Sequence, residues 1–88
     1  MDINDIITKT INILKQEFPV LAGMELTPLT PLLSAGLLDS FAIVTTVAIL
    51  EDELDIDIDV EKLEPEQFET ATTIAGFCHE LLQGGSNG

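Results

Sequence analysis

The sequence predicts an all-α fold, a four-helix bundle with three longer helices, one short helix and a long first loop. Three observations support this prediction. Apolar residues recur at intervals of three and four in three separate segments, which is the period of a helix with one buried face. Each of these segments follows a residue that can cap a helix. The one alternating stretch, Ile56, Ile58 and Val60, has no second stretch to pair with, so we interpret it as an extended turn rather than a strand.

The first helix is expected at about residues 2–17, with Asp2 as its cap. Pro19 ends it, because the residue before a proline is driven out of the helical region. The apolar positions of this helix are Ile3, Ile6, Ile7, Ile11, Leu14 and Phe18.

Residues 19–38 are expected to form a long loop, because prolines and glycines interrupt the whole stretch. This loop is also rich in leucine, which a solvated linker would not be. We therefore expect it to pack over the helices, and loops of this length in a small domain usually have a function.

The second helix is expected at residues 40–54, with Asp39 as its N-cap. One stripe of this helix should face the core, namely Ile43, Val47, Leu50 and Leu54. The opposite face would then carry Ala42, Thr45, Ile49 and Asp52, and the helix ends in an acidic run, residues 51–53.

A short helix is expected at about residues 60–64, and a last helix at residues 71–82 with Thr70 as its cap. Ile74, Cys78 and Leu81 share one apolar face of this last helix. Residues 1–83 would form one domain, and residues 84–88, GGSNG, a flexible tail.

The chain has 88 residues and a net charge of −13, from 16 acidic residues against 3 lysines. Nucleic acid and an anionic membrane surface are excluded as partners, because both need a basic surface. The length leaves little room for a catalytic cleft, so we expect no enzyme activity. The N-terminus lacks the pattern of a signal peptide and no apolar run is long enough to span a membrane, so a cytoplasmic protein is expected. We also expect a monomer.

Ser40 stands at the start of the second helix, and two roles are open to it. Serine is a preferred capping residue, so Ser40 could simply stabilise the helix. The start of a helix also favours an anion, because its free N–H groups and its dipole are positive. A phosphate ester on the Ser40 hydroxyl would therefore be electrostatically favourable.

The stretch GLLDSF, residues 36–41, resembles the attachment motif of the acyl and peptidyl carrier protein family. That motif is an Asp-Ser pair followed by a large apolar residue, here Asp39, Ser40 and Phe41. The acidic end of the second helix and the order of the helices also fit, so that the resemblance covers residues 2–82.

The resemblance implies that a phosphopantetheinyl transferase attaches 4′-phosphopantetheine from coenzyme A to Ser40. The arm would carry an acyl or aminoacyl group as a thioester. The implied partners are the transferase, an acyl- or aminoacyl-activating ligase and the downstream acyl-transfer enzymes. A fatty acyl group, an amino acid and a polyketide unit are all compatible with the sequence.

Fatty-acid carriers of this family usually have carboxylates along the outward face of the second helix, and this chain does not. We expect partners to dock on a largely uncharged face instead, which favours a dedicated carrier of a specialised biosynthetic pathway. The expected docking residues are Leu38, Ala42, Thr45, Ile49 and Asp52.

Other interpretations of the chemistry-bearing residues are weaker. The acids of residues 55–66 have the spacing of a calcium-binding EF-hand loop, but Val60 stands where that loop needs glycine, so we expect no metal site. A hydrolase would have to use His79, the one histidine, without a nucleophile elbow around Ser40. Cys78 is interpreted as a buried structural thiol. The remaining alternative is an acidic helical module that binds a partner protein and carries no prosthetic group.

Overall fold

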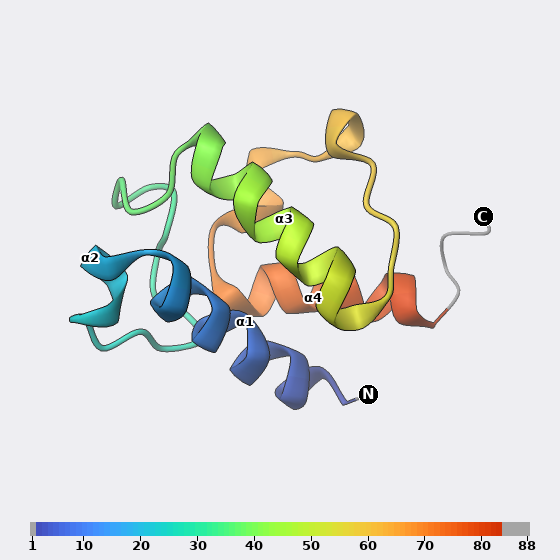
Figure 1. The fold of residues 1–88 in the computed structure, drawn as a ribbon, viewed down its shortest axis with the longest axis horizontal. Helices are drawn as coiled ribbons and strands as arrows, with labels where there is room; N and C mark the ends of the chain where they lie inside the picture. The colour runs from blue at the N-terminus through green and yellow to red at the C-terminus, as the bar shows by residue number, and fades with distance from the viewer. Residues whose placement is uncertain (1, 84–88) are drawn as a thin grey trace.

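The computed structural model describes residues 2–83. Its elements are α1 (Ile3–Glu17), α2 (Pro19–Ala22), α3 (Ser40–Leu54), the 3₁₀ helices η1 (Val60–Lys62) and η2 (Pro65–Phe68), and α4 (Ala71–Leu82) (Figure 1). Within this described range there is no strand, so the prediction of an all-α fold is confirmed. None of these helices is long and apolar enough to cross a membrane.

Both long helices of the second half begin and end where the sequence predicts them. Asp39 caps α3 and Thr70 caps α4, each by a side-chain oxygen that accepts a hydrogen bond from a backbone N–H of the first turn. Asp55 closes α3 in the left-handed conformation, with φ 55°. The expected tail at residues 84–88 lies outside the described residues.

Two short elements differ from the expectation. Residues 19–38 are not a loop throughout, because α2 begins directly at Pro19. Proline suits the first position of a helix, where its missing N–H would have no partner anyway. The short helix expected at residues 60–64 is the single 3₁₀ turn η1, and η2 follows it.

The core forms where α1, α3 and α4 bring their apolar faces together, with α1 packed mainly against α4. The stripe predicted for α3 is buried at Val47, Leu50 and Leu54, whereas Ile43 is only half-buried. Loop residues contribute as well. The side chains with at most 1% exposure include Ile6, Leu14, Leu21, Leu32, Phe68 and Ile74.

The long connection between α2 and α3 is fastened to the beginning of α4 (Figure 1). The Leu32 N–H donates to the Glu69 carbonyl at 2.6 Å, and the Ser34 N–H donates to Glu69 Oε1 at 3.1 Å. The Ser34 hydroxyl donates to the other oxygen of the same carboxylate. Nearer to α2, the Thr72 hydroxyl donates to the Pro28 carbonyl at 2.9 Å. These contacts fix the loop that leads to the start of α3.

Candidate functional site

The loop reaches α3 through a tight turn. Gly36 has φ +76°, a conformation that glycine adopts without strain, and its N–H donates to the Leu33 carbonyl at 3.0 Å. The N–H groups of Leu37 and Leu38 then both donate to the Leu32 carbonyl, at 2.8 and 3.1 Å. Since Leu32 is itself bonded to Glu69, between η2 and α4, the residues just before α3 are held in place.

Asp39 and Ser40 have separate roles at the start of α3. Asp39 Oδ1 accepts a hydrogen bond from the Ala42 N–H at 2.8 Å, so Asp39 is the N-cap, as predicted. Ser40 is the first residue of the helix, and it is exposed. Among the hydrogen bonds found within residues 2–83, none involves the Ser40 hydroxyl. The capping role therefore belongs to Asp39, and the Ser40 hydroxyl is accessible for chemistry.

The surroundings of Ser40 suit a phosphate ester that carries a partly apolar arm. Ser40 begins a helix of 15 residues, whose N-terminal dipole end stabilises negative charge. A shallow groove of about 180 Å³ opens beside it. The groove is lined by Ser40, Ile43, Val44, Val60, Leu63, Glu64, Pro65 and Phe68. Phe68 is 1% exposed and forms part of the apolar wall.

The outward face of α3 differs from the one expected. Leu38 and Ala42 are buried in the core, at 5% and 6% exposure, so their placement on a docking surface is wrong. Thr45 and Ile49 are half-buried, and of the five expected docking residues only Asp52 is exposed. The residues that α3 turns to solvent near Ser40 are Phe41, Val44 and Ala48. The reason is that apolar side chains surround most of this helix, so its periodicity does not single out one face.

The acidic end of α3 has a structural role. Glu51 Oε2 accepts a hydrogen bond from the Ile58 N–H at 2.7 Å, which draws the extended turn back against the helix. Ile58 is buried at 6% exposure. Nowhere in residues 2–83 do three or more histidine, cysteine, aspartate or glutamate side chains come close enough together to hold a metal ion.

Cys78 and His79 lie on α4, and neither belongs to the groove beside Ser40. Cys78 is fully buried, and this burial raises the pKa of its thiol to about 11. Such a thiol is protonated at neutral pH and is a poor nucleophile. His79 is half-buried near the C-terminal end of the helix.

The burial of Cys78 predicts a pH dependence of stability. The unfolded chain loses the thiol proton near pH 9, whereas the folded chain keeps it until about pH 11. The stabilising contribution is therefore present below pH 9 and is lost as the pH rises through 11. We expect the free energy of unfolding to fall by about 3 kcal/mol over that window. Urea titrations at several pH values measure it, and Cys78→Ala should lack this fall. An equal fall in the free energy of unfolding of Cys78→Ala would assign the pH dependence to the lysines instead.

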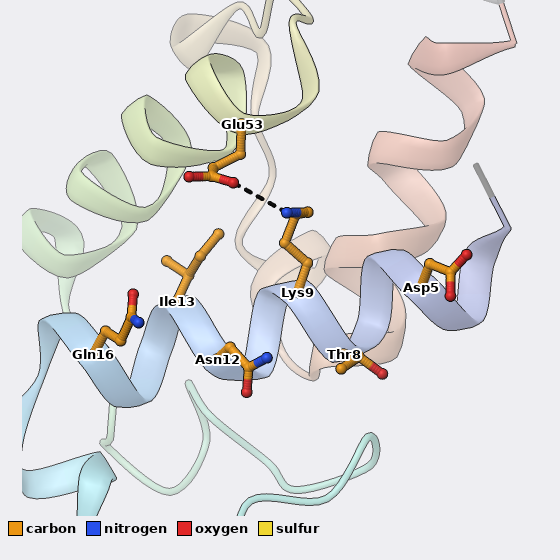
Figure 2. A pocket seen from close by; sticks show the side chains of 7 residues that line it. All are labelled: Asp5, Thr8, Lys9, Asn12, Ile13, Gln16 and Glu53. Atoms are coloured by element: carbon orange, nitrogen blue, oxygen red, sulfur yellow. Dashed lines mark hydrogen bonds and ion pairs between the residues drawn. The ribbon is translucent and has the colours of Figure 1, made fainter.

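A second depression lies between α1 and the C-terminal end of α3, far along α3 from Ser40 (Figure 2). Its volume is about 440 Å³ and its lining is mostly polar. Lys9 Nζ and Glu53 Oε1 lie 3.0 Å apart across it, with Ile13 beside them. Both charged side chains are partly exposed, so this ion pair contributes little to stability. Among the described residues, no cluster of metal ligands lies in this depression.

The comparisons with known proteins agree with the site at α3. Residues 9–81 match the model of the family described as the phosphopantetheine attachment site. This match spans most of the chain and includes the turn at Gly36, the whole of α3 and the groove beside it. No curated protein matches the chain.

Proposed function

Because this chain belongs to the phosphopantetheine attachment-site family, and is thus a phosphopantetheine-carrying carrier protein, we propose that Ser40 is the residue that takes the group. The observation that carries this assignment is the division of roles at the start of α3: Asp39 caps the helix and leaves the exposed Ser40 hydroxyl without a structural task. We assign residues 1–83 to the carrier domain of a cytoplasmic monomer.

The attachment step uses one atom of this chain. The Ser40 hydroxyl oxygen forms a bond to the phosphorus of the phosphopantetheine half of coenzyme A. The phosphoanhydride bond breaks, the adenosine bisphosphate half leaves, and the hydroxyl proton passes to the transferase or to solvent. The helix dipole stabilises the charge of the resulting phosphodiester.

When bound, the group supplies a terminal thiol that holds an acyl or aminoacyl cargo as a thioester. The chain contributes position: the fastened loop and the Asp39 cap hold Ser40 at the surface, and a mostly apolar groove lies beside it. Tethering raises the local concentration of the cargo at each partner enzyme, so the carrier needs no bond chemistry of its own.

We assign the cargo to a specialised biosynthetic pathway rather than to general fatty-acid synthesis. The support is the uncharged surface next to Ser40, where Phe41, Val44 and Ala48 are exposed and the acids of α3 begin only at Glu51. Besides the transferase, the expected partners are an acyl- or aminoacyl-activating ligase and the enzymes that take the cargo over.

The test is intact-protein mass spectrometry after incubation with coenzyme A, magnesium and phosphopantetheinyl transferases of two different specificities. We expect one phosphopantetheine increment, and peptide fragmentation should locate it on Ser40 and not on Ser34 or Ser86. No increment with either transferase on a folded protein, or an increment on another serine, would contradict the assignment.

A further inference from the structure

Glu69 holds the turn before α3 by three hydrogen bonds. Its backbone carbonyl accepts from the Leu32 N–H at 2.6 Å. One oxygen of its carboxylate accepts from the Ser34 N–H at 3.1 Å, and the other oxygen accepts from the Ser34 hydroxyl. Hydrogen bonds to a charged acceptor are stronger than those between neutral groups. The carboxylate therefore holds a loop residue that lies 35 positions earlier in the sequence.

A short series of contacts connects this anchor to the start of α3. The Leu32 carbonyl accepts hydrogen bonds from the N–H groups of Leu37 and Leu38, at 2.8 and 3.1 Å. Leu38 is buried at 5% exposure and directly precedes Asp39, the cap of α3. The position of the anchored turn thus determines where the first turn of α3, with Ser40, is placed.

Glu69 itself lies between two residues that are fixed. Phe68, before it, is 1% exposed in the core, and Thr70, after it, caps α4. The Glu69 N–H donates to the Glu66 carbonyl at 3.3 Å, so the backbone of Glu69 is also held. A carboxylate on such a support loses little freedom when it accepts hydrogen bonds, and the anchor is therefore pre-organised.

The segment that carries the anchor also forms one wall of the groove beside Ser40. Phe68 and Ser40 both line this groove. Since Glu69 directly follows Phe68, one short stretch of backbone holds both the wall and the turn that precedes Ser40. Loss of the carboxylate would leave the wall in the core and release the turn.

We propose that Glu69 is a positioning residue for the modification of Ser40, because its carboxylate keeps the turn at residues 33–36 in the one arrangement that a phosphopantetheinyl transferase engages. This inference rests on the proposed function of Ser40. Without the carboxylate the turn populates further conformations, and only a fraction of the chains is ready to bind. The apparent affinity falls by that fraction, whereas the rate within the bound complex does not change.

The experiment measures kcat and KM for modification of the unmodified chain by a broad-specificity transferase, from intact mass. Glu69→Ala should raise KM about 3- to 10-fold and leave kcat within about 2-fold. The effect is moderate because the backbone hydrogen bond between Leu32 and Glu69 remains. Glu69→Gln should restore the wild-type KM. Its amide oxygen accepts from the Ser34 N–H, while its NH₂ group donates to the Ser34 hydroxyl.

Thr72→Val is the matched control for Glu69→Ala. It removes the hydroxyl that donates to the Pro28 carbonyl at 2.9 Å, a contact of the same loop nearer to α2. Both variants should lower the midpoint of urea denaturation, but only Glu69→Ala should raise KM. Adding Ser34→Ala to Glu69→Ala should raise KM no further, because the Ser34 hydroxyl has already lost its partner.

Amide hydrogen exchange examines the turn without any enzyme. Each exchange rate is divided by that of the Leu50 N–H in the middle of α3, which corrects for the change in global stability. In Glu69→Ala the N–H groups of Gly36 and Leu37 should exchange at least about 10-fold faster on this scale. In Thr72→Val their relative rates should not change.

Four results would overturn the proposal. An unchanged KM in Glu69→Ala, or unchanged exchange at Gly36 and Leu37, would mean that the carboxylate does not position the site. An equal rise of KM in Thr72→Val would assign the effect to the loop as a whole. A Glu69→Gln chain as impaired as Glu69→Ala would make Glu69 a charge that the transferase recognises. A wild-type chain that gains no mass would contradict the proposed function of Ser40, whereas faster exchange in Glu69→Ala would still support the anchor.

Discussion

Ser40→Ala is expected to keep its unmodified mass under conditions that modify the wild-type chain completely, while its free energy of unfolding stays within about 0.5 kcal/mol of the wild-type value. The loss is complete because the variant has no hydroxyl at the attachment position. The stability is retained because Asp39 makes the cap and the Ser40 side chain is exposed. Intact-protein mass spectrometry and urea denaturation measure the two quantities.

The neighbouring residue provides the matched control. Asp39→Ala leaves the Ala42 N–H without its partner and should cost about 1 kcal/mol, the usual value of a lost N-cap. Ser40→Asp should fold and remain unmodified. If Ser40→Ala cost as much stability as Asp39→Ala, Ser40 would share the cap. If Ser40→Asp still gained the group, the attachment would lie elsewhere.

Phe68→Ala is expected to lower the free energy of unfolding by about 3–5 kcal/mol. Phe68 is 1% exposed, and it connects the core to the groove beside Ser40. Its truncation leaves a cavity that the short helix η2 cannot fill. The total stability of a domain of this size is only about 4–13 kcal/mol, so the variant should lose a large share of it. Urea denaturation at neutral pH measures the change.

A second phenylalanine, Phe41, provides the matched control for Phe68→Ala. Phe41→Ala removes the same group of atoms from a side chain that is 78% exposed, and its free energy of unfolding should change by less than about 0.5 kcal/mol. Phe68→Leu should lie between the two. Equal losses in Phe68→Ala and Phe41→Ala would mean that burial does not determine the cost.

The helices of the second half could be predicted closely because their signals are local. Asp39 and Thr70 are capping residues that each precede an apolar repeat, and the structure begins α3 and α4 directly after them. Whether Ser40 shares the cap stayed open in the sequence, and the hydrogen bond from the Ala42 N–H to Asp39 Oδ1 answers it. The burial of Cys78 followed from its place between Ile74 and Leu81.

The orientation of α3 could not be predicted in the same way. Its apolar residues are distributed over most of its circumference, so several faces are compatible with burial. Leu38 and Ala42 are buried in the core, whereas Phe41 is exposed to solvent. The largest apolar side chain of the three is therefore the one that stays outside. That choice depends on how the loop approaches the helix, and the approach is set by residues far away in the sequence.

α2 was missed for a related reason. Pro19 ends α1 as expected, but the same proline is a favourable first residue for the next helix. The hydrogen bonds from Leu32 and Ser34 to Glu69 could not be predicted from local sequence patterns, because they join residues that are more than 30 positions apart.

Those hydrogen bonds also determine when the site becomes complete during synthesis. Ser34 lies 35 residues before Glu69, and Pro28 lies 44 residues before Thr72. A nascent chain whose synthesis has just passed Ser40 cannot yet fasten the loop that leads to it, since Glu69 and Thr72 are not yet made. The surroundings of Ser40 are therefore among the last parts of the chain to form. A partner that recognises the assembled site consequently acts on chains that have finished folding.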